Sequence, residues 1–335
     1  MLFQKKLRLW HTVNRRNEMN KMQVKAINMK EPGKIMFRDV DLGKLKPNEI
    51  LVRTKACGIC KFDINAFSGK IKDSYLDEPG HEGVGIIEEV GEEVGELKPG
   101  DKVAALGRGA FGNYFKASKN MVAKIPQETE DFEYWMAEPV ACVVNGLRST
   151  IIQPGDTVAI IGCGYMGLLL TQGLPKEYIT HLFCIDINDE RLELAKEFGA
   201  DTILNSIQTD AVEYIKSEKG EVDVVIEAAG AQGTSDIATE LLRKGGKLII
   251  FGHHVEKELV DMGAWHMKGL RILNPSPMLS SDFSKDFQDA VKLMKRGTFA
   301  QKKLITHTFA FLEIQKAFSF VSSKPPHYIK GVILY

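Results

Sequence analysis

Three residues far apart in the chain carry side chains suited to binding a divalent metal: Cys60, His81 and Glu138. One thiolate, one imidazole and one carboxylate, with water in the fourth position, form the open tetrahedral set of a catalytic zinc ion, whereas a structural zinc site uses four protein ligands. Cys60 also forms a Cys-x-x-Cys pair with Cys57, which would fit a redox pair or half of a structural zinc site. No second Cys-x-x-Cys follows, so the pattern favours the mixed set.

A glycine-rich motif follows an apolar run in the second half of the chain and precedes a helical pattern. In the dinucleotide-binding fingerprint G-x-G-x-x-G, the first glycine permits a tight turn and the second lets the pyrophosphate approach the backbone. The third lets helix and strand pack closely. The diphosphate then binds free N–H groups at the helix N-terminus. The motif predicts dinucleotide binding by Gly162, Gly164, Tyr165, Met166 and Gly167.

An acidic residue indicates which dinucleotide is bound. Asp186 stands 19 residues after Gly167, at the end of the next predicted strand. A carboxylate at this position accepts the ribose hydroxyls and repels a 2′-phosphate, so the sequence predicts NAD rather than NADP. In a second interpretation, Asp186 only caps the following turn. Arg191 could instead serve a 2′-phosphate, although a salt bridge with an acid such as Glu190 is its commoner role.

These groups need two different scaffolds to position them. From residue 22 to about 129, short alternating runs with Gly and Pro between them predict a β-rich unit, with strands at 50–56, 84–90 and 102–106. From about residue 150, apolar runs alternate with helical stretches, which predicts βαβ units on a parallel sheet. The predicted strands there are 157–161, 182–185, 222–226 and 247–251, and the predicted helices are 191–198, 209–216 and 235–242.

The tail of the chain, from about residue 282, has the pattern of the first unit, so we expect it to return there. It combines helices at 282–295 and 312–321 with extended runs at 304–309 and 328–334. The sequence therefore predicts an α/β protein with four segments. They are an extension at 1–21, a β-rich catalytic domain at 22–149, a nucleotide-binding domain at 150–285 and a return to the catalytic domain at 286–335.

Composition excludes several other classes of protein. The 335 residues suggest about two domains. Because 44 basic residues balance 44 acidic ones, a nucleic-acid binder is disfavoured. No run of 18 apolar residues exists to cross a membrane. Five cysteines without dense, even spacing favour a reducing compartment, and we expect a cytoplasmic protein. The basic N-terminal residues lack the apolar core of a secretory signal, so we expect a disordered extension, with a targeting arm as the alternative.

Several motifs occur in order along the chain: Cys60, Gly80-His81-Glu82-x-x-Gly85, Pro99-Gly100-Asp101-Lys102-Val103, Glu138-Pro139 and Gly162-x-Gly164-x-x-Gly167. This ordered set resembles the zinc-dependent medium-chain dehydrogenase/reductase family, the alcohol and polyol dehydrogenases. The resemblance covers about residues 22–335 and implies a GroES-like β domain that encloses a catalytic zinc, with an inserted Rossmann domain. It implies that Cys60 and His81 are zinc ligands, whereas the third ligand is open. In some branches the residue matching Glu138 binds the metal. In polyol dehydrogenases the residue matching Glu82 can do so, and the Glu138 position then holds the zinc-bound water.

Further site residues come from the same resemblance. Gly252 ends a predicted strand where relatives contact the nicotinamide side of the cofactor, and Lys330 matches a position where relatives place Arg near the diphosphate. The candidate catalytic residues are Glu82, Glu138 and Asp63.

The sequence departs from the family pattern in two places. Phe62 stands where relatives have a Ser or Thr that passes the substrate proton outward, and Asn65 stands where some relatives have a relay His. The proton would then have to leave through zinc-bound water, through a site glutamate or through a substrate hydroxyl. Residues 101–137 contain no cysteine, so the lobe for a structural zinc is missing, and we predict one Zn²⁺ per chain.

The sequence thus predicts zinc-dependent hydride transfer between a secondary alcohol and NAD. A polyol, cyclitol or sugar-derived substrate is favoured because Glu138-Pro139 resembles the polyol branch, and the family implies a homo-oligomer, a dimer or a tetramer. One alternative is a zinc-free NAD(P)H reductase of the same fold. Another is a non-catalytic NAD-binding regulatory protein.

Overall fold

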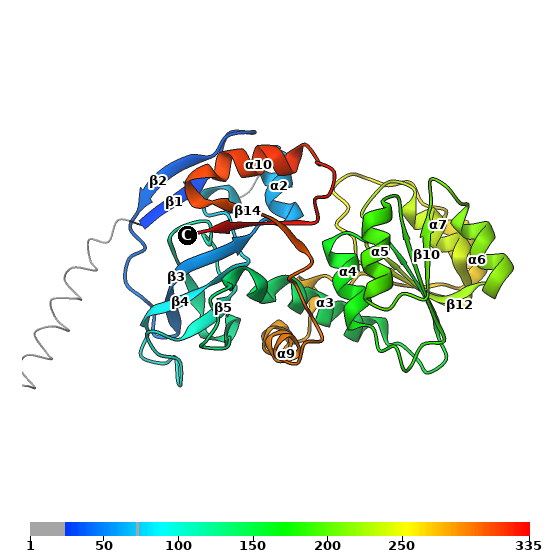
Figure 1. Cartoon of the computed structure of the whole chain (residues 1–335), viewed down its shortest axis with the longest axis horizontal. Coiled ribbons are helices and arrows are strands. Elements are labelled where there is room, and N and C mark those ends of the chain that lie inside the picture. The colour runs from blue at the N-terminus through cyan, green and yellow to red at the C-terminus, as the bar shows by residue number, and fades with distance from the viewer. Residues whose placement is uncertain (1–23, 72–73) are drawn as a thin grey trace, which may run out of the picture. The chain divides into compact units, whose positions relative to one another are not determined.

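A computed structural model describes residues 24–71 and 74–335, and the extension predicted at 1–21 lies outside the described residues. The chain forms two compact units (Figure 1). One contains the described residues up to 136 together with 307–335, and the other contains 137–306. The predicted α/β class is confirmed, since the first unit is rich in strands and the second is built on a parallel sheet.

The first unit is organised around a seven-stranded sheet with β3 at its centre. Its strands follow the order β14-β15-β3-β4-β5-β7, and β6 pairs with the first half of β3. The strands are β3 (Glu49–Gly58), β4 (Gly83–Val90), β5 (Lys102–Ala105), β6 (Tyr114–Ser118), β7 (Val122–Lys124), β14 (Ile305–Ala310) and β15 (Lys330–Leu334). A separate antiparallel pair consists of β1 (Val24–Asn28) and β2 (Met36–Val40).

The pairing of β3 with β4 and with β15 brings several candidate site residues close together. At the end of β3, Cys57 lies opposite Gly83 of β4 on one side and opposite Ile333 of β15 on the other. The segment that follows β3 therefore comes close to the residues just before β4 and to the first residue of β15. These neighbouring positions hold Cys60, His81, Glu82 and Lys330.

Among the described residues of the first unit there are also two helices and four short 3₁₀ turns: α2 (Lys61–Phe67), η1 (Ser74–Asp77), η2 (Lys119–Met121), η3 (Phe132–Trp135), η5 (Phe311–Glu313) and α10 (Ile314–Ser322). The sequence analysis predicted only strands up to residue 129 and missed α2. Cys60 is the N-cap residue of this helix, and the Asp63 carboxylate accepts its N–H at 2.7 Å. A carboxylate three residues after the cap is a helix-start signal that the sequence did contain.

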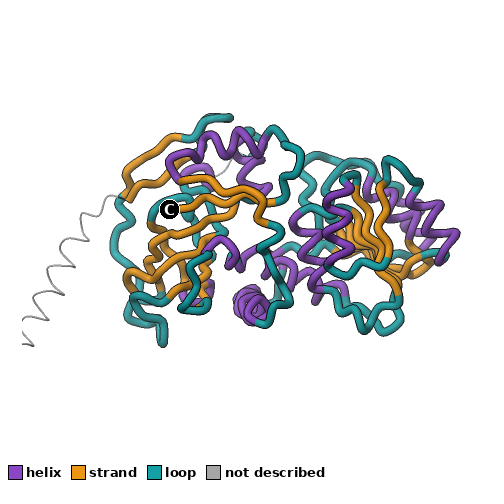
Figure 2. Tube along the Cα trace, viewed as in Figure 1, coloured by secondary structure: helices purple, strands orange, loops and turns teal. Residues whose placement is uncertain are grey.

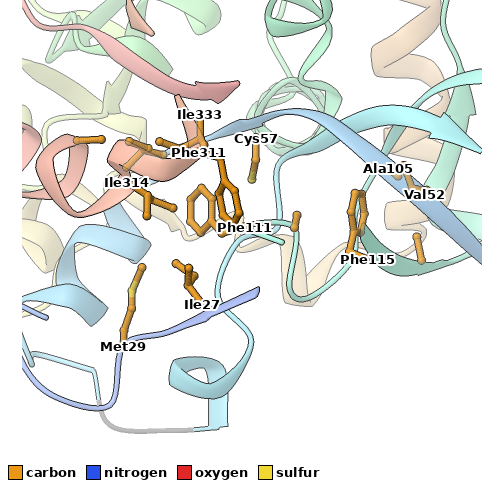
Figure 3. Close-up of a cluster of buried hydrophobic side chains, with 14 of the residues drawn as sticks. Ile27, Met29, Val52, Cys57, Ala105, Phe111, Phe115, Phe311, Ile314 and Ile333 are labelled. Carbon is orange, nitrogen blue, oxygen red and sulfur yellow. The ribbon is translucent and has the colours of Figure 1, made fainter. Parts of the chain in front are cut away.

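A large apolar core lies beneath the main sheet, and Figure 3 shows part of it. Its largest fully buried members are Phe111, Phe115 and Phe318. Cys57 belongs to this cluster and is fully buried among apolar side chains (Figure 3). It is therefore a core residue, whereas Cys60 stands three residues later, beyond the end of the strand.

The second unit has a six-stranded sheet in the order β10-β9-β8-β11-β12-β13, with helices beside the strands (Figure 2). All five pairings of neighbouring strands are parallel. The strands are β8 (Thr157–Ile161), β9 (His181–Asp186), β10 (Thr202–Asn205), β11 (Val222–Glu227), β12 (Leu242–Ile250) and β13 (Arg271–Leu273). The helices are α3 (Ala137–Thr150), α4 (Tyr165–Gly173), α5 (Asp189–Glu197), α6 (Ala211–Lys219), α7 (Thr234–Leu241), α8 (Met262–Lys268) and α9 (Phe283–Lys295), with a 3₁₀ turn η4 (Pro277–Leu279).

The units divide at different residues from those expected in the sequence analysis. The divisions fall after residues 136 and 306 rather than after 149 and 285. Helices α3 and α9 account for most of the difference, because they are joined to each other within the second unit. The Arg148 guanidinium of α3 lies 2.9 Å from the Asp286 carboxylate and 2.6 Å from that of Asp289, both on α9.

Within residues 24–71 and 74–335, we find no helix with the length and apolar character needed to cross a membrane.

Candidate metal centre and cofactor loop

Three possible metal ligands of the first unit come together: Cys60, His81 and Glu82. One ligand atom from each lies within 4.8 Å of the other two. Cys60 follows the end of β3, and the His81-Glu82 pair directly precedes β4. Glu82 is buried, and the other two are partly accessible. A cluster with one sulfur, one nitrogen and one oxygen donor matches the ligands that zinc takes in open sites.

A second layer of polar groups surrounds His81. Its Nδ1 lies 2.9 Å from the Tyr75 hydroxyl, which donates a hydrogen bond to Oδ1 of Asp63. The same hydroxyl accepts the N–H of Gly80 at 2.8 Å. Asp63 is completely buried. Burial raises the pKa of its carboxyl, while the nearby His81, the Tyr75 hydroxyl and the Cys60 N–H oppose this rise.

Glu82 makes a buried ion pair with Lys330. The Lys330 ammonium donates a hydrogen bond to Oε1 at 2.8 Å and lies 2.6 Å from Oε2. Among the described residues, Oε2 has no partner with hydrogen-bond geometry. A Cβ atom on Gly58 would lie only 1.9 Å from this Oε2 and 2.5 Å from the Met136 sulfur. A glycine at position 58 is thus what leaves room for the Glu82 carboxylate.

The charges of this cluster fit a divalent cation. Asp63, Glu82 and Lys330 are all at least nine-tenths buried, and buried charges require compensation. If Cys60 is a thiolate and His81 is neutral, the cluster carries two net negative charges, which one Zn²⁺ would balance. Burial raises the pKa of the Cys60 thiol, while its hydrogen bond to His81 and the charge of His81 lower it. The donor types and the charge balance therefore fit a zinc ion, whose binding would displace the Cys60 proton.

Glu138 belongs to the second unit, where it is the second residue of α3. Its Oε1 accepts a hydrogen bond from the Cys142 thiol, one helical turn later, at 3.2 Å. Glu82 is the carboxylate that the first unit brings to Cys60 and His81.

The glycine-rich loop has the shape that the sequence analysis predicted. Gly162 has a φ of +97°, a conformation that favours glycine. A Cβ on Gly167 would lie 1.8 Å from the Gly162 carbonyl oxygen, so this glycine permits close packing of α4 against β8. By contrast, a Cβ on Gly164 would meet no atom within 4 Å. The space above Gly164 at the start of α4 fits a diphosphate group.

Asp186 holds this loop from the end of β9. Its Oδ2 accepts the N–H of Cys163 at 2.6 Å, and its Oδ1 accepts that of Asn188 at 3.0 Å. Asp186 therefore makes hydrogen bonds of the turn-capping kind that the second interpretation predicted. Because each carboxylate oxygen can accept a further hydrogen bond, this contact is compatible with ribose binding.

The remaining candidate cofactor residues have varied environments. The buried Tyr165 donates its hydroxyl hydrogen to Gln301 at 2.6 Å, and Met166 is partly exposed on the same helix. The backbone N–H of Arg191 donates to Asn188, which caps α5. A Cβ on Gly252 would lie 2.5 Å from Oε2 of the buried Glu227, so Gly252 accommodates that carboxylate. Lys330 contacts Glu82, as described above.

The two positions that depart from the expected proton path lie on α2. The Phe62 ring packs edge-on against Tyr75, with ring centroids 4.9 Å apart, and it carries no hydroxyl. Asn65 is buried, and its Nδ2 has no hydrogen-bond partner in the described ranges.

Sequence reasoning missed two residues of this site. Tyr75 received no role, because a tyrosine six residues before a histidine has no recognisable spacing. No pattern in the sequence marks Gly58, because its importance depends on Glu82 being folded against it.

Comparison with known proteins agrees with this architecture. Residues 46–127 match the family model "Alcohol dehydrogenase GroES-like domain", and residues 166–296 match "Zinc-binding dehydrogenase". An alcohol dehydrogenase of Geobacillus stearothermophilus is 30% identical over 298 residues, covering 78% of this chain and 86% of that protein. A D-xylulose reductase of Saccharomyces cerevisiae is 28% identical over 348 residues, covering 92% and 97%. The solved structure of a zinc-binding dehydrogenase from Sinorhizobium meliloti, bound to NADP, has a TM-score of 0.80 and 26% identity, covering 94% of this chain and all of that one.

The chain therefore belongs to the zinc-containing medium-chain alcohol dehydrogenase family and is an oxidoreductase of the alcohol and polyol dehydrogenase class. Zinc and NAD(P) are the cofactors of this class, and they agree with the metal-ligand cluster and the glycine-rich loop.

Proposed function

We propose that this protein binds one Zn²⁺ per chain and transfers a hydride between a secondary alcohol and NAD. The observation that carries the proposal is the convergence of Cys60, His81 and Glu82 in one cluster, whose net negative charge one Zn²⁺ would balance. A zinc ion held there would act as a Lewis acid on the substrate oxygen. Cys60 and His81 would hold the ion, and the Gly162–Gly167 loop would bind the cofactor.

We propose Glu82 as the first candidate for the third ligand and keep Glu138 as the alternative. Glu82 already lies with Cys60 and His81 in one unit. Its pairing with Lys330 weakens the case, because the ammonium group competes with a metal for the carboxylate. The variants Glu82→Gln and Glu138→Gln distinguish the two assignments. Replacing the ligand should lower zinc affinity at least tenfold, whereas replacing a water-holding residue should lower turnover with little loss of metal.

For the substrate, we propose a polyol, cyclitol or sugar-derived secondary alcohol. Two observations support this class: the Glu138-Pro139 pair of the polyol branch and the similarity to a D-xylulose reductase over nearly the whole chain. For the cofactor, Asp186 supports NAD, because its carboxylate stands where a 2′-phosphate would be repelled. The NADP in the Sinorhizobium meliloti structure belongs to that protein and does not decide the preference here.

A matched cysteine pair tests the metal-dependent function. We expect purified wild-type protein to contain one zinc per chain and to form NADH when polyols and cyclitols are screened with NAD⁺. Cys60→Ser should remove most of the zinc and the activity. Cys57→Ala, in the buried core three residues earlier, should retain both.

Two other outcomes would support the alternative functions. Activity in protein with less than half an equivalent of zinc would indicate a zinc-free reductase. Full zinc and NAD binding, with no turnover across the screen, would indicate a regulatory protein.

We also propose that the protein is a homo-oligomer, a dimer or a tetramer. The short strand β13 ends the order of the parallel sheet, and an unpaired sheet edge can add a second strand. Exposed apolar side chains occur close to it in the sequence: Leu259, Met262, Met267, Leu273 and Met278. Analytical ultracentrifugation should give a mass of at least two chains, and Leu273→Lys should lower it. A wild-type mass of one chain at micromolar concentration would contradict this proposal.

A cytoplasmic location is proposed on the state of the cysteines. None of the five forms a disulfide bond in the described part of the chain, and reduced thiols persist in reducing compartments. Fractionation of cells that express the full chain would test the location.

A further inference from the structure

The hydroxyl of Tyr75 lies between the carboxylate of Asp63 and the imidazole of His81. Asp63 and His81 do not form a direct hydrogen bond, because Oδ1 and Nδ1 are 3.9 Å apart. Tyr75 bridges them, with its oxygen 2.9 Å from Nδ1 and its hydrogen donated to Oδ1. Tyr75 comes from η1, Asp63 comes from α2, and His81 comes from the segment before β4. Three separate chain segments therefore meet at the Tyr75 hydroxyl oxygen.

The hydrogen count at the Tyr75 oxygen indicates which tautomer of His81 fits this arrangement. A tyrosine hydroxyl has one hydrogen to donate, and its oxygen accepts. The hydrogen goes to Asp63, and one acceptor position takes the Gly80 N–H at 2.8 Å. The Tyr75 oxygen also contacts Nδ1 of His81, but it has no second hydrogen to donate. This contact is therefore a hydrogen bond only if Nδ1 carries the proton. The lone pair of His81 then lies on Nε2, which is the nitrogen that would bind a metal.

The groups around the tyrosine hold it in this position. The Phe62 ring packs edge-on against the Tyr75 ring, and the rings of Tyr75 and His81 are also edge-on, with centroids 5.9 Å apart. Asp63 is held by the Cys60 N–H through its other oxygen, at 2.7 Å. The same carboxylate thus contacts the backbone of one metal-binding residue and, through Tyr75, the side chain of another.

We propose that Tyr75 is a positioning residue of the metal centre, whose hydroxyl connects Asp63 to His81 and keeps the His81 proton on Nδ1. This inference rests on the proposed zinc site and assigns a function to a residue outside the ligand set. Outer hydrogen-bond partners of a ligating histidine fix its tautomer and orientation, and their loss typically lowers metal affinity about 10–100-fold. The proposal also explains Phe62, which supports the Tyr75 ring and has no hydroxyl of its own.

The variant Tyr75→Phe tests the proposal, because it removes the hydroxyl and keeps the ring packed against Phe62. In metal-free wild-type protein, ¹⁵N NMR should show His81 with its proton on Nδ1, the signal being assigned with His81→Gln. In Tyr75→Phe, a substantial population should carry the proton on Nε2. Competition with a fluorescent chelator should show Zn²⁺ binding about 10–100-fold weaker than in the wild type. An unchanged tautomer, or a Zn²⁺ affinity within twofold of the wild type, would overturn the proposal.

A matched control tests whether the loss of any tyrosine hydroxyl in this unit would change the His81 tautomer and the Zn²⁺ affinity. Tyr335 lies in the same unit, and its hydroxyl donates to the Ala110 carbonyl at 3.3 Å. Tyr335→Phe should leave the His81 tautomer and the Zn²⁺ affinity unchanged. A comparable loss of affinity in this control would show that Tyr75 has a general structural role and would contradict the proposal.

The bridging part of the proposal has its own test in a double-variant cycle with Asp63→Asn. If Asp63 acts on His81 through Tyr75, Asp63→Asn should weaken Zn²⁺ binding by a smaller factor in the Tyr75→Phe background than in the wild type. Equal factors would show that the two residues act independently and would overturn the bridge. If Tyr75→Phe does not fold, the wild-type spectrum decides, because a proton on Nε2 contradicts the proposal by itself. Since the tautomer is read without metal, this failure is distinct from a failure of the wild type to bind zinc.

Discussion

Glu82 and Lys330 form a buried ion pair, with 2.6 Å between carboxylate and ammonium, although 248 residues separate them in the chain. The pair joins the start of β15 to the metal-ligand cluster next to β4. Lys330 was expected from the family resemblance to lie near a cofactor diphosphate. In the structure its ammonium compensates a buried carboxylate, which is one of the candidate zinc ligands.

Lys330→Met should therefore destabilise the metal-free protein by about 3–5 kcal/mol, the usual cost of leaving one partner of a buried ion pair uncompensated. Urea denaturation of the metal-free protein measures this loss. The loss should be smaller with Zn²⁺ bound, because the metal supplies positive charge next to Glu82. The double variant Glu82→Gln/Lys330→Met is the control and should recover part of the stability. A single variant as stable as the wild type would mean that the pair contributes no net stability.

Two glycines of the cofactor loop should respond in opposite ways to alanine. Gly164→Ala should leave the melting temperature nearly unchanged, because its Cβ would meet no atom within 4 Å, but it should weaken NADH binding at least tenfold by occupying space meant for the diphosphate. Gly167→Ala should lower stability by about 1–3 kcal/mol, the range for overpacking, because its Cβ would lie 1.8 Å from the Gly162 carbonyl oxygen. Calorimetry and NADH fluorescence titration measure the two effects. Normal NADH affinity in Gly164→Ala would show that no diphosphate lies there.

Asp186→Asn should reduce the preference for NADH over NADPH. The neutral amide no longer repels a 2′-phosphate, so the ratio of the two dissociation constants should shift toward NADPH at least tenfold. Asp201→Asn is a matched control, since its carboxylate also accepts a backbone N–H, that of Leu182, at the opposite end of β9. An unchanged ratio in Asp186→Asn would assign this residue to turn capping alone.

Asp289 should stabilise the second unit near neutral pH and lose this stabilising contribution in acid. The hydrogen bond from Lys285, followed by that from Lys292, holds the pKa of this carboxyl well below its usual range. A lowered pKa in the folded state stabilises the protein above the unfolded pKa of about 4, and this contribution is lost as the pH falls toward the folded value. Because both lysines are exposed, the contribution is about 1 kcal/mol or less.

The comparison of Asp289→Asn with the wild type measures this contribution. The variant should be less stable near pH 7 and should approach the wild type as the pH falls from 4 toward 2. The difference near pH 7 should also shrink in 1 M NaCl, because salt screens exposed pairs. A stability difference that stays constant from pH 7 to pH 2 would contradict the assignment.

Local patterns in the sequence were sufficient to predict the structure of the cofactor loop. The strand predicted at 157–161 is β8, the glycine at 162 has a positive φ, and the glycine at 167 allows the close helix–strand packing. All three features depend on residues within about ten positions of one another, so the spacing alone carries the information. The metal-binding residue types were visible for the same reason: Cys60 and His81 follow and precede recognisable strands.

The helix α2, the Tyr75 bridge and the Glu82–Lys330 pair could not be derived in this way. Helix α2 has only seven residues, too few for a periodic pattern, and the contact between Tyr75 and His81 depends on how their loop folds against α2. Glu82 meets Lys330 only because β15 returns to pair with β3. By itself, the sequence determined the chemical types of the donors and the glycine-rich loop. The tertiary structure decided which carboxylate lies beside Cys60 and His81 and which charge compensates it, because those contacts are made by strand pairing between distant segments.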